Sequence, residues 1–391
     1  MIVPTDNAIT IKQLTADPYP IYKKLRAQTP VLKVSAVRRI LITKSEDTQF
    51  IKLNPELFSS DDPNTPMERA FSAKTLMRRD GDDHMRLRTA MMPALTPGMV
   101  KKVWNAQVEK IADEYIARLP RGETVDFFKD FAGPFSARCL AVVLGIPKAS
   151  DDDIQRWSQT LIDGAGNFGG DPELFRLTDG ANQEINACIA DAVKTGKGRD
   201  ESSALAVQAY SDDPIEMEHI LSNIKIAIGG GINEPRDSIL TALYGLLTNP
   251  DQFKAVIEEP GLCGKAFEEA VRWVAPIQVS SRLVKEDTEI RGYDIAKGDT
   301  VMTIQASANH DEDVYENGHL FNLFRKEKRH QAFGNGPHFC MGTHLSRRMI
   351  GEIALPRLLD RFPNMKLSDS VDVVWSGFGF RGPLNLPITL N

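Results

Sequence analysis

The sequence has few cysteines, and no two of them lie close together. Its 391 residues contain four, Cys139, Cys188, Cys263 and Cys340. A disulfide framework needs a regular set of cysteines, and a cysteine-rich zinc or redox site needs a CxxC pair. Both are therefore excluded, and we expect free thiols in the reducing cytoplasm.

Long apolar runs and an excess of basic residues are also missing. No stretch of about 18 residues is continuously apolar, and the opening MIVPTDNAITIKQL lacks the basic patch and apolar core of a signal peptide. We expect no membrane anchor. The formal net charge is −6, which gives no basic field for DNA or RNA, so we expect no nucleic-acid partner.

The composition that remains, 42% hydrophobic and 26% charged residues, is typical of a globular protein. Near the N-terminus, the pattern predicts a helix between Pro18 and Pro30, followed by two strands within residues 31–44. Residues 55–83 are polar and rich in turn formers. We predict that they form a long loop, which in a folded domain usually has a function.

Helical spacing dominates from residue 84 to about residue 255. Helices are predicted over 105–119, over 217–249 if that segment is continuous, and over 265–276, and strand-like alternation follows. These patterns predict a mainly α fold with small β regions (α+β) and a single domain over 1–391. Its β-rich parts are expected at roughly 30–55 and 278–305, with helices in the remainder.

Cys340 lies in the stretch AFGNGPHFCMGTHLSRRM, between a glycine-rich loop and a predicted helix start. A helix N-terminus favours a thiolate, and glycines allow positive φ angles and close approach to a flat ligand. The thiolate could serve as a nucleophile, a zinc ligand or a haem ligand. Zinc would have His344 as its only obvious further ligand, and no base or oxyanion site marks a nucleophile. A haem iron needs only one cysteine.

The segment FGNGPHFCMG resembles the cysteine-ligand loop of the cytochrome P-450 family, F-G-x-G-x-H-x-C-x-G, at every fixed position. EAVR, with Glu269 and Arg272, resembles the E-x-x-R pair of that family. SSRLVKEDTEIRGYDIAKGD and DGDDHMRLR resemble two segments that supply haem propionate partners. The resemblance runs from about residue 17 to the C-terminus, so it covers nearly the whole chain.

The resemblance implies a cytochrome P-450 fold, a triangular prism of helices around a buried haem b, with O2 as co-substrate. Cys340 would be the metal ligand, the axial thiolate on the haem iron, and thiolate donation favours O–O cleavage. The other implied cofactor-binding residues contact the propionates or shape the loop around the sulfur: His338, Arg282, His84, Arg88, Phe333, Gly334 and Gly342.

The central helix departs from the family pattern A/G-G-x-D/E-T, because residues 227–238 read AIGGGINEPRDS. Asn233 takes the place of the acid and Glu234 that of the threonine. Three glycines and Pro235 within a helix predict a kinked and opened segment. Since the acid–alcohol pair is missing, our hypothesis is that Glu234 is catalytic and either delivers the proton or holds the water that does, assisted by Asn233.

Two further departures lie near the cysteine loop. Where the family usually has an arginine that completes a network with E-x-x-R, the segment YENGHLFNLFR has Leu320 next to His319. The network is therefore expected to be incomplete. Pro356 lies within the last predicted helix, where proline is unusual.

The resemblance implies a bacterial, ferredoxin-dependent monooxygenase, expected to be a monomer, that takes electrons from NAD(P)H through a reductase and an iron–sulfur ferredoxin. FRKEKRH (324–330) and Arg347-Arg348 are basic and could bind an acidic ferredoxin. The substrate would be a small organic molecule, with a lean towards aromatic compounds that are hydroxylated or O-demethylated. Its expected contacts are Phe71, Phe168, Gly230, Ile277, Gln278, Val279 and Phe378. Two alternatives remain: a peroxide-using, coupling or rearranging enzyme, and a non-catalytic haem-thiolate sensor or binding protein.

Overall fold

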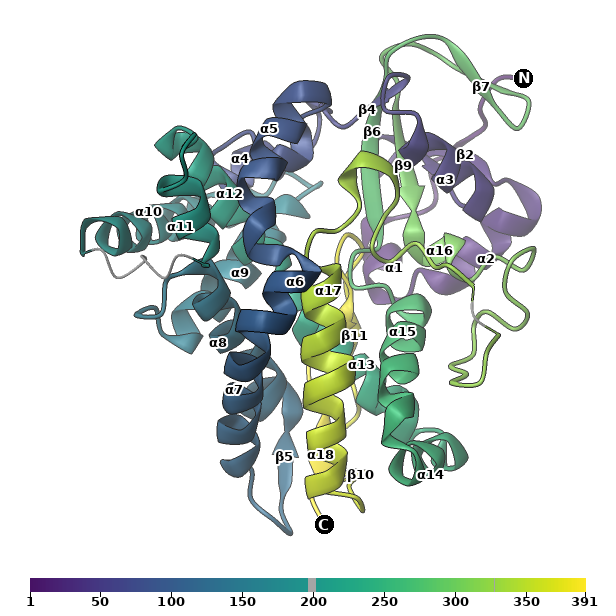
Figure 1. Ribbon diagram of the computed structural model, residues 1–391. Coiled ribbons are helices and arrows are strands. Elements are labelled where there is room, and N and C mark those ends of the chain that lie inside the picture. The colour runs from purple at the N-terminus through teal and green to yellow at the C-terminus, as the bar shows by residue number, and fades with distance from the viewer. Residues whose placement is uncertain (196–201, 327) are drawn as a thin grey trace.

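Helices make up most of the protein in the computed structural model, which describes residues 1–195, 202–326 and 328–391 (Figure 1). The α-helices are α1 (Ile11–Ala16), α2 (Tyr19–Gln28), α3 (Ser45–Leu53), α4 (Met67–Phe71), α5 (Gly81–Met91), α6 (Pro97–Met99), α7 (Asn105–Ala117), α8 (Gly133–Leu144), α9 (Asp151–Ala165), α10 (Pro172–Thr195), α11 (Ala204–Ala209), α12 (Met217–Gly230), α13 (Asn233–Leu247), α14 (Pro250–Glu258), α15 (Cys263–Trp273), α16 (Gln305–Ala308), α17 (Thr343–Ser346) and α18 (Leu355–Arg361). Short 3-10 turns and three π-helical segments, η3 (Val100–Trp104), η4 (Phe128–Ala132) and η7 (Arg347–Ala354), join some of them.

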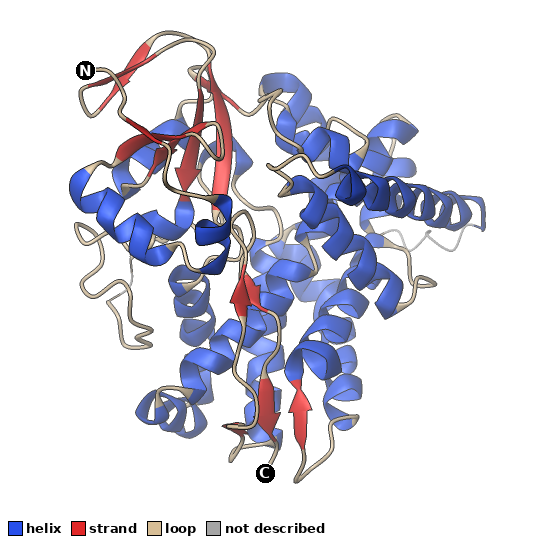
Figure 2. Cartoon of the chain, turned by 180° about the vertical axis from the view of Figure 1, so that it is seen from behind, coloured by secondary structure: helices blue, strands red, loops and turns tan. Residues whose placement is uncertain are grey.

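The strands gather in two places, near the N-terminus and near the C-terminus (Figure 2). They are β1 (Thr5–Asp6), β2 (Val31–Val34), β3 (Arg39–Ile42), β4 (Phe58–Ser59), β5 (Thr124–Asp126), β6 (Val279–Val284), β7 (Thr288–Ile290), β8 (Tyr293–Ile295), β9 (Thr300–Ile304), β10 (Lys366–Leu367), β11 (Trp375–Ser376), β12 (Gly382–Pro383) and β13 (Pro387–Thr389). The largest sheet has the order β1-β2-β3-β9-β6-β4, and β10, β13 and β5 form a smaller one. The predicted mainly α fold with small β regions is confirmed.

Residues 55–83 are more ordered than the predicted long loop. They contain β4, the helix α4 and a 3-10 turn at Leu76–Arg78. Phe58 of β4 pairs with Val284 of β6, and both Phe58 and Phe71 are fully buried. The prediction of a loop was wrong because packing of these two aromatic side chains outweighs the weak local propensity of a polar segment.

The central helix is broken, as its glycines predicted. α12 ends at Gly230, Gly231 and Ile232 leave the helical conformation, and α13 begins at Asn233. A Cβ at Gly231 would lie 2.8 Å from Leu140 Cδ1, so this position has no room for a side chain. Pro235 falls in the first turn of α13, where its missing N–H has no partner to lose. The break therefore lies before the proline and is caused by the glycine segment.

The helix after the cysteine loop accommodates Pro356 in a similar way. α17 runs into the π-helical segment η7, and α18 then begins at Leu355, so Pro356 lies in the first turn of a new α-helix. η7 packs closely against α15, because a Cβ at Gly351 would lie 3.1 Å from Gly264 Cα. The segment with the cysteine and the segment with E-x-x-R are thus in near-backbone contact.

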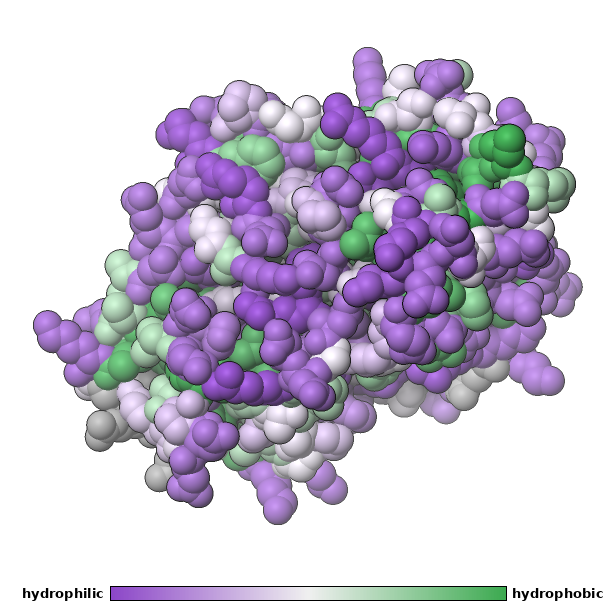
Figure 3. Space-filling view, turned by 90° about the horizontal axis from the view of Figure 1, so that it is seen from above, coloured by the Kyte–Doolittle hydropathy of each residue, from purple (hydrophilic) through white to green (hydrophobic). Residues whose placement is uncertain are grey.

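Within the described ranges, no helix combines the length and the apolar character needed to cross a bilayer. The face seen from above is mostly hydrophilic, with hydrophobic residues scattered among polar ones (Figure 3).

Candidate functional site

The loop that carries Cys340 is closed by its own hydrogen bonds. The Cys340 N–H donates to Phe333 O over 2.9 Å, and the hydroxyl of Thr343 donates to Cys340 O over 2.7 Å. Gly334 and Gly336 have φ angles of +73° and +67°. These are left-handed conformations that glycine adopts without steric cost. The loop therefore presents one thiol at the start of α17 in a fixed position.

A buried glutamine, Gln331, links this loop to α3 by hydrogen bonds. The amide nitrogen of Gln331 donates to Ser45 O and Oγ, and its oxygen accepts from Thr48 Oγ1 and Asn335 Nδ2. The backbone N–H of Gln331 donates to Asn309 Oδ1. Because both polar atoms of the Gln331 side chain and its backbone N–H have hydrogen-bond partners, the loop is held against α3 with little freedom.

Buried cationic side chains gather beside the loop. Lys52 is 4% exposed and Arg282 is 6% exposed, and the rings of His84 and His338 contact each other at a tilt of 35°, with their centroids 4.1 Å apart. Among the described residues, Lys52 Nζ, His84 Nε2 and His338 Nδ1 have no hydrogen-bond partner. A buried ammonium without a counter-charge is costly. This group of residues therefore fits an anionic ligand, and the two propionates of a haem are such a ligand.

The pKa values of the basic residues beside the cysteine loop also indicate a site for an anionic ligand. Burial lowers the pKa of His84 to about 4, helped by the charges of His338 and Arg88. Burial likewise lowers the pKa of Lys52 far below its usual value, and the nearby Arg282 adds to the effect. Like charges held together out of water disfavour each other. A bound dianion would relieve this repulsion.

Arg88 joins α5 to the cysteine loop, since its Nη2 donates to Phe339 O over 2.6 Å. The sequence-predicted cofactor residues thus come from three places, α5 (His84, Arg88), β6 (Arg282) and the cysteine loop, and the fold brings them together. Gly342 also lies at the sulfur, because its Cβ would be 3.8 Å from Cys340 Sγ.

Glu234 and Asn233 lie in the first turn of α13, directly after the helix break. Both carboxylate oxygens of Glu234 and both polar atoms of the Asn233 side chain are buried without a hydrogen-bond partner in the described part of the chain. Burial raises the pKa of Glu234 to about 8. The side chain of Cys340 is exposed, and its thiol is within electrostatic reach of the Glu234 carboxyl group.

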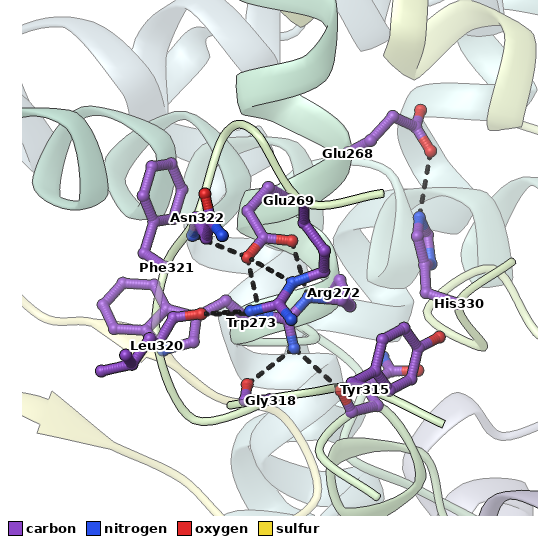
Figure 4. Close-up of polar contacts among 12 residues, drawn as sticks. Glu268, Glu269, Arg272, Trp273, Tyr315, Gly318, Leu320, Phe321, Asn322 and His330 are labelled. Carbon is purple, nitrogen blue, oxygen red and sulfur yellow. Dashed lines mark hydrogen bonds and ion pairs between the residues drawn. The ribbon is translucent and has the colours of Figure 1, made fainter. Parts of the chain in front are cut away.

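The E-x-x-R network is complete, which corrects the expectation drawn from Leu320 (Figure 4). Arg272 Nε and Nη2 donate to the Glu269 carboxylate over 2.7 Å each, and Arg325 Nε donates to Glu269 Oε1 over 3.2 Å. Arg272 also donates to the backbone oxygens of Gly318 and Leu320. The arginine that seemed to be missing is supplied by Arg325, five residues after Leu320, because the intervening chain turns back on itself.

Comparison with known proteins agrees with this geometry. A family model described as Cytochrome P450 matches residues 262–373. A putative cytochrome P450, YjiB, of Bacillus subtilis is 28% identical over 91% of this chain and 90% of its own length. The 6-deoxyerythronolide B hydroxylase of Saccharopolyspora erythraea is 31% identical over 83% of this chain and 80% of its own length. The chain belongs to the cytochrome P450 family.

Solved structures confirm the P450 fold. The crystal structure of P450BioI in complex with an acyl carrier protein ligated to hexadec-9Z-enoic acid superposes with a TM-score of 0.88, at 24% identity. It covers 97% of this chain and 100% of that one. This P450 is accordingly a monooxygenase with haem b as cofactor and O2 as co-substrate, and it acts on a small-molecule substrate with electrons from a redox partner.

The predicted substrate contacts lie in three regions of the P450. Phe71 ends α4 and is 1% exposed, and its ring faces Gly229, whose Cβ would lie 2.7 Å from Phe71 Cζ. Phe168 follows α9 and packs on Phe378 at 5.9 Å between ring centroids. The others are Gly230 at the end of α12 and Ile277, Gln278 and Val279 at the start of β6. The side-chain amide of Gln278 is already engaged by the protein itself, since Nε2 donates to Ala275 O over 2.5 Å. No comparison tests these contacts, so they stay predictions.

Two residues of the cation group were missed from the sequence, Lys52 of α3 and Arg78. Arg78 is buried, and its Nη1 donates to Ser60 O over 3.0 Å. Lys52 lies one turn after the buried Thr48 on the same face of α3. A lysine on the buried stripe of an amphipathic helix is the signal that could have identified it.

Proposed function

We propose that this P450 inserts one oxygen atom of O2 into a small organic substrate, by hydroxylation or oxidative O-demethylation, and that the thiolate of Cys340 would hold the haem iron. When bound, haem b supplies the iron at which O2 is activated. The observation that carries the proposal is the group of buried basic side chains beside the glycine loop of Cys340, in which Lys52 Nζ, His84 Nε2 and His338 Nδ1 have no hydrogen-bond partner among the described residues. We assign the propionates to His84, Arg88, Arg282 and His338, and the shielding of the sulfur to Phe333, Gly334 and Gly342.

Glu234 is the proposed proton donor, and Asn233 holds the water that supplies it. A carboxyl group with a pKa of about 8 keeps its proton at neutral pH and can release it to a neighbour of higher affinity. The helix break supports this role, because it frees the first turn of α13 from the ordinary helical hydrogen bonds. We propose aromatic substrates because three of the residues expected to contact substrate, Phe71, Phe168 and Phe378, have aromatic rings.

Electrons are proposed to come from NAD(P)H through an iron–sulfur ferredoxin that binds a basic groove. A groove of about 660 Å³ adjoins the cysteine loop. Its basic lining residues are Lys265, Arg272, Arg325, Lys326, Lys328, Arg329 and Arg347, against two acids, Glu268 and Glu269. Arg348 does not line it and instead pairs with Glu352. Of the predicted basic stretch 324–330, Glu327 lies outside the described residues. The four unpaired thiols support a cytoplasmic location.

Reconstitution with a ferredoxin, its reductase and NAD(P)H tests this function. We expect substrate-dependent oxidation of NAD(P)H with stoichiometric product. Lys326→Glu should slow reduction by ferredoxin roughly tenfold, an order of magnitude typical of a charge reversal at an electrostatically guided interface, and should leave reduction by dithionite unchanged. Equal salt dependence of the two reductions would contradict ferredoxin binding at the groove.

A second candidate function is favoured by the missing threonine. An altered proton route suits a family member that uses peroxide or that couples or rearranges its substrate. Turnover with peroxide but not with ferredoxin would favour that candidate. A lack of turnover by any route would favour a haem-thiolate sensor.

Lys52 is proposed as a further propionate partner. Lys52→Met keeps the length of the side chain and removes the buried charge. We expect the haem to dissociate about ten to a hundred times faster, the range of one charge-assisted hydrogen bond, while the apoprotein becomes more stable because an unpaired charge is removed. Transfer of haem to apomyoglobin and urea unfolding of the apoprotein measure the two effects. An unchanged transfer rate would contradict the assignment.

A further inference from the structure

A second pocket, of about 470 Å³, shares no lining residue with the basic groove and lies where four segments meet. These are the β2–β3 turn, the loop before α4, the turn between α9 and α10, and the turn before β9. One of its lining residues, Phe168, is among the residues expected to contact substrate. The pocket therefore adjoins one of the expected substrate contacts.

The lining of this pocket is positively charged in a protein whose net charge is negative. Its charged residues are Lys33, Arg38 and Arg39 against Asp299. Lys33 and Arg38 are exposed, and the ion pairs of the described residues include neither of them. The carboxylate of Asp299 accepts the N–H of Ala296 over 3.1 Å through Oδ2 and forms no ion pair with either cation. The lining thus keeps an excess of positive charge, with Lys33 and Arg38 free of any ion pair among the described residues.

Arg39 holds the charged side of the pocket in place through its hydrogen bonds. It is 4% exposed, Nη1 donates to Val37 O and Arg38 O over 3.3 and 3.1 Å, and Nη2 donates to Asn64 O over 2.7 Å. Nη2 also pairs with the buried Asp62 at 3.4 Å. The β2–β3 turn is thereby fastened to the loop before α4, and the charge of Arg39 is largely balanced by Asp62.

Arg38 is held in a conformation that arginine seldom adopts. Its φ is +53°, in the left-handed region that favours glycine. Such strain persists only where the surroundings enforce it, and it concentrates at binding sites. Here the guanidinium of Arg39 donates to the carbonyl of Arg38, which holds the backbone from which the exposed Arg38 side chain extends at the pocket.

Aromatic side chains pack beside the charged wall. Phe168 lines the pocket, lies under the guanidinium of Arg39 at 6.0 Å, and packs on Phe378. Phe168 Cε2 also lies 3.9 Å from the position of a Cβ at Gly379, and Gly379 O accepts the N–H of Gln278 at the start of β6. A ligand with a charged end in the pocket would therefore have aromatic surface beside its apolar part.

We propose that this pocket binds the carboxylate or phosphate group of an amphipathic organic anion, with Lys33 and Arg38 as its charged partners and Phe168 along its apolar part. The proposal rests on the monooxygenase function above and names its substrate class. A free acid and a phosphate ester share the anionic chemistry, so the test must separate them.

Calorimetric titration of the holoenzyme with dodecanoate, dodecyl phosphate and dodecan-1-ol tests the pocket. At low ionic strength we expect at least one anion to bind roughly ten- to hundredfold more tightly than the alcohol, as expected for one or two charge-assisted hydrogen bonds. In the variant Lys33→Gln/Arg38→Gly this preference should fall to about equal affinity. Glycine suits the left-handed φ at position 38, so the charge is removed without strain.

The variant Lys23→Gln/Lys24→Gln is the matched control, because it removes two exposed charges of α2 that do not line the pocket. It should keep the preference. Tighter binding of dodecanoate alone indicates free acids, and of dodecyl phosphate alone indicates phosphorylated or carrier-linked substrates. Equal binding of all three compounds, no binding of either anion, or an unchanged preference in the pocket variant overturns the proposal. Anion preference without turnover would overturn the monooxygenase proposal alone.

Discussion

Cys340→Ser is expected to abolish turnover while the protein still folds. The hydroxyl is a poor iron ligand, so the carbon monoxide difference spectrum should lose the band that is diagnostic of a thiolate. A barrier higher by about 4 kcal/mol already corresponds to about a thousandfold loss of rate, and we expect at least this loss. The loop itself should persist, because its hydrogen bonds run through the backbone of residues 333–340 and through Gln331.

Cys188→Ser is the matched control, because Cys188 is only partly buried and lies on α10, away from the loop. It should retain both the thiolate band and full activity. A thiolate band that survives in Cys340→Ser would show that another cysteine binds the iron and would refute the assignment.

Glu234→Gln is expected to uncouple the enzyme. The amide keeps the size of the side chain but cannot donate a carboxyl proton. Proton transfer by a positioned side chain is worth about 10² to 10⁴ in rate, so product formed per electron consumed should fall at least tenfold, with reduced oxygen species released in its place. Product, NAD(P)H and peroxide are measured together. Glu234→Thr restores the hydroxyl of the family pattern and should recover part of the coupling, whereas unchanged coupling in Glu234→Gln would end the hypothesis.

The same carboxyl group predicts a dependence of stability on pH. Its pKa rises from 4.5 to about 8 on folding, because burial disfavours the charged form. Between these pH values the folded state holds one proton more than the unfolded state, so the free energy of unfolding falls as the pH rises. Glu234→Gln removes the carboxyl group and with it this fall in the free energy of unfolding. Urea unfolding at pH 5 and at pH 8 should therefore show a smaller difference for the variant than for the parent.

The sequence was sufficient for the features that depend on local patterns. Gly334 and Gly336 of the cysteine loop have positive φ angles, and the three glycines of 229–231 do end α12. Both outcomes follow from what glycine does to a backbone. Residues 55–83 could not be predicted as well, since their order comes from the burial of Phe58 and Phe71 against distant segments.

Distant partners also explain what was missed at the site. Arg325 reaches Glu269 only because residues 316–325 turn back over α15, and no spacing rule records that turn. Lys52 was missed for a related reason. Its role depends on the approach of α3 to the cysteine loop, where a Cβ at Gly336 would lie 2.3 Å from Lys52 O.

The close contact between Gly351 and Gly264 has a consequence for electron transfer. The absence of a side chain at Gly351 lets η7 approach α15 almost to backbone contact, and these two segments supply Gly264, Glu268 and Arg347 to the basic groove. A methyl group at Gly351 would force the neighbouring α15 to give way by a few tenths of an ångström, whereas one at Gly264 would meet nothing within 4 Å. Electron tunnelling weakens exponentially with distance. One side chain reduced to a hydrogen atom thus helps to set how closely the segment after the cysteine loop lies to the groove at which we propose that the electron donor binds.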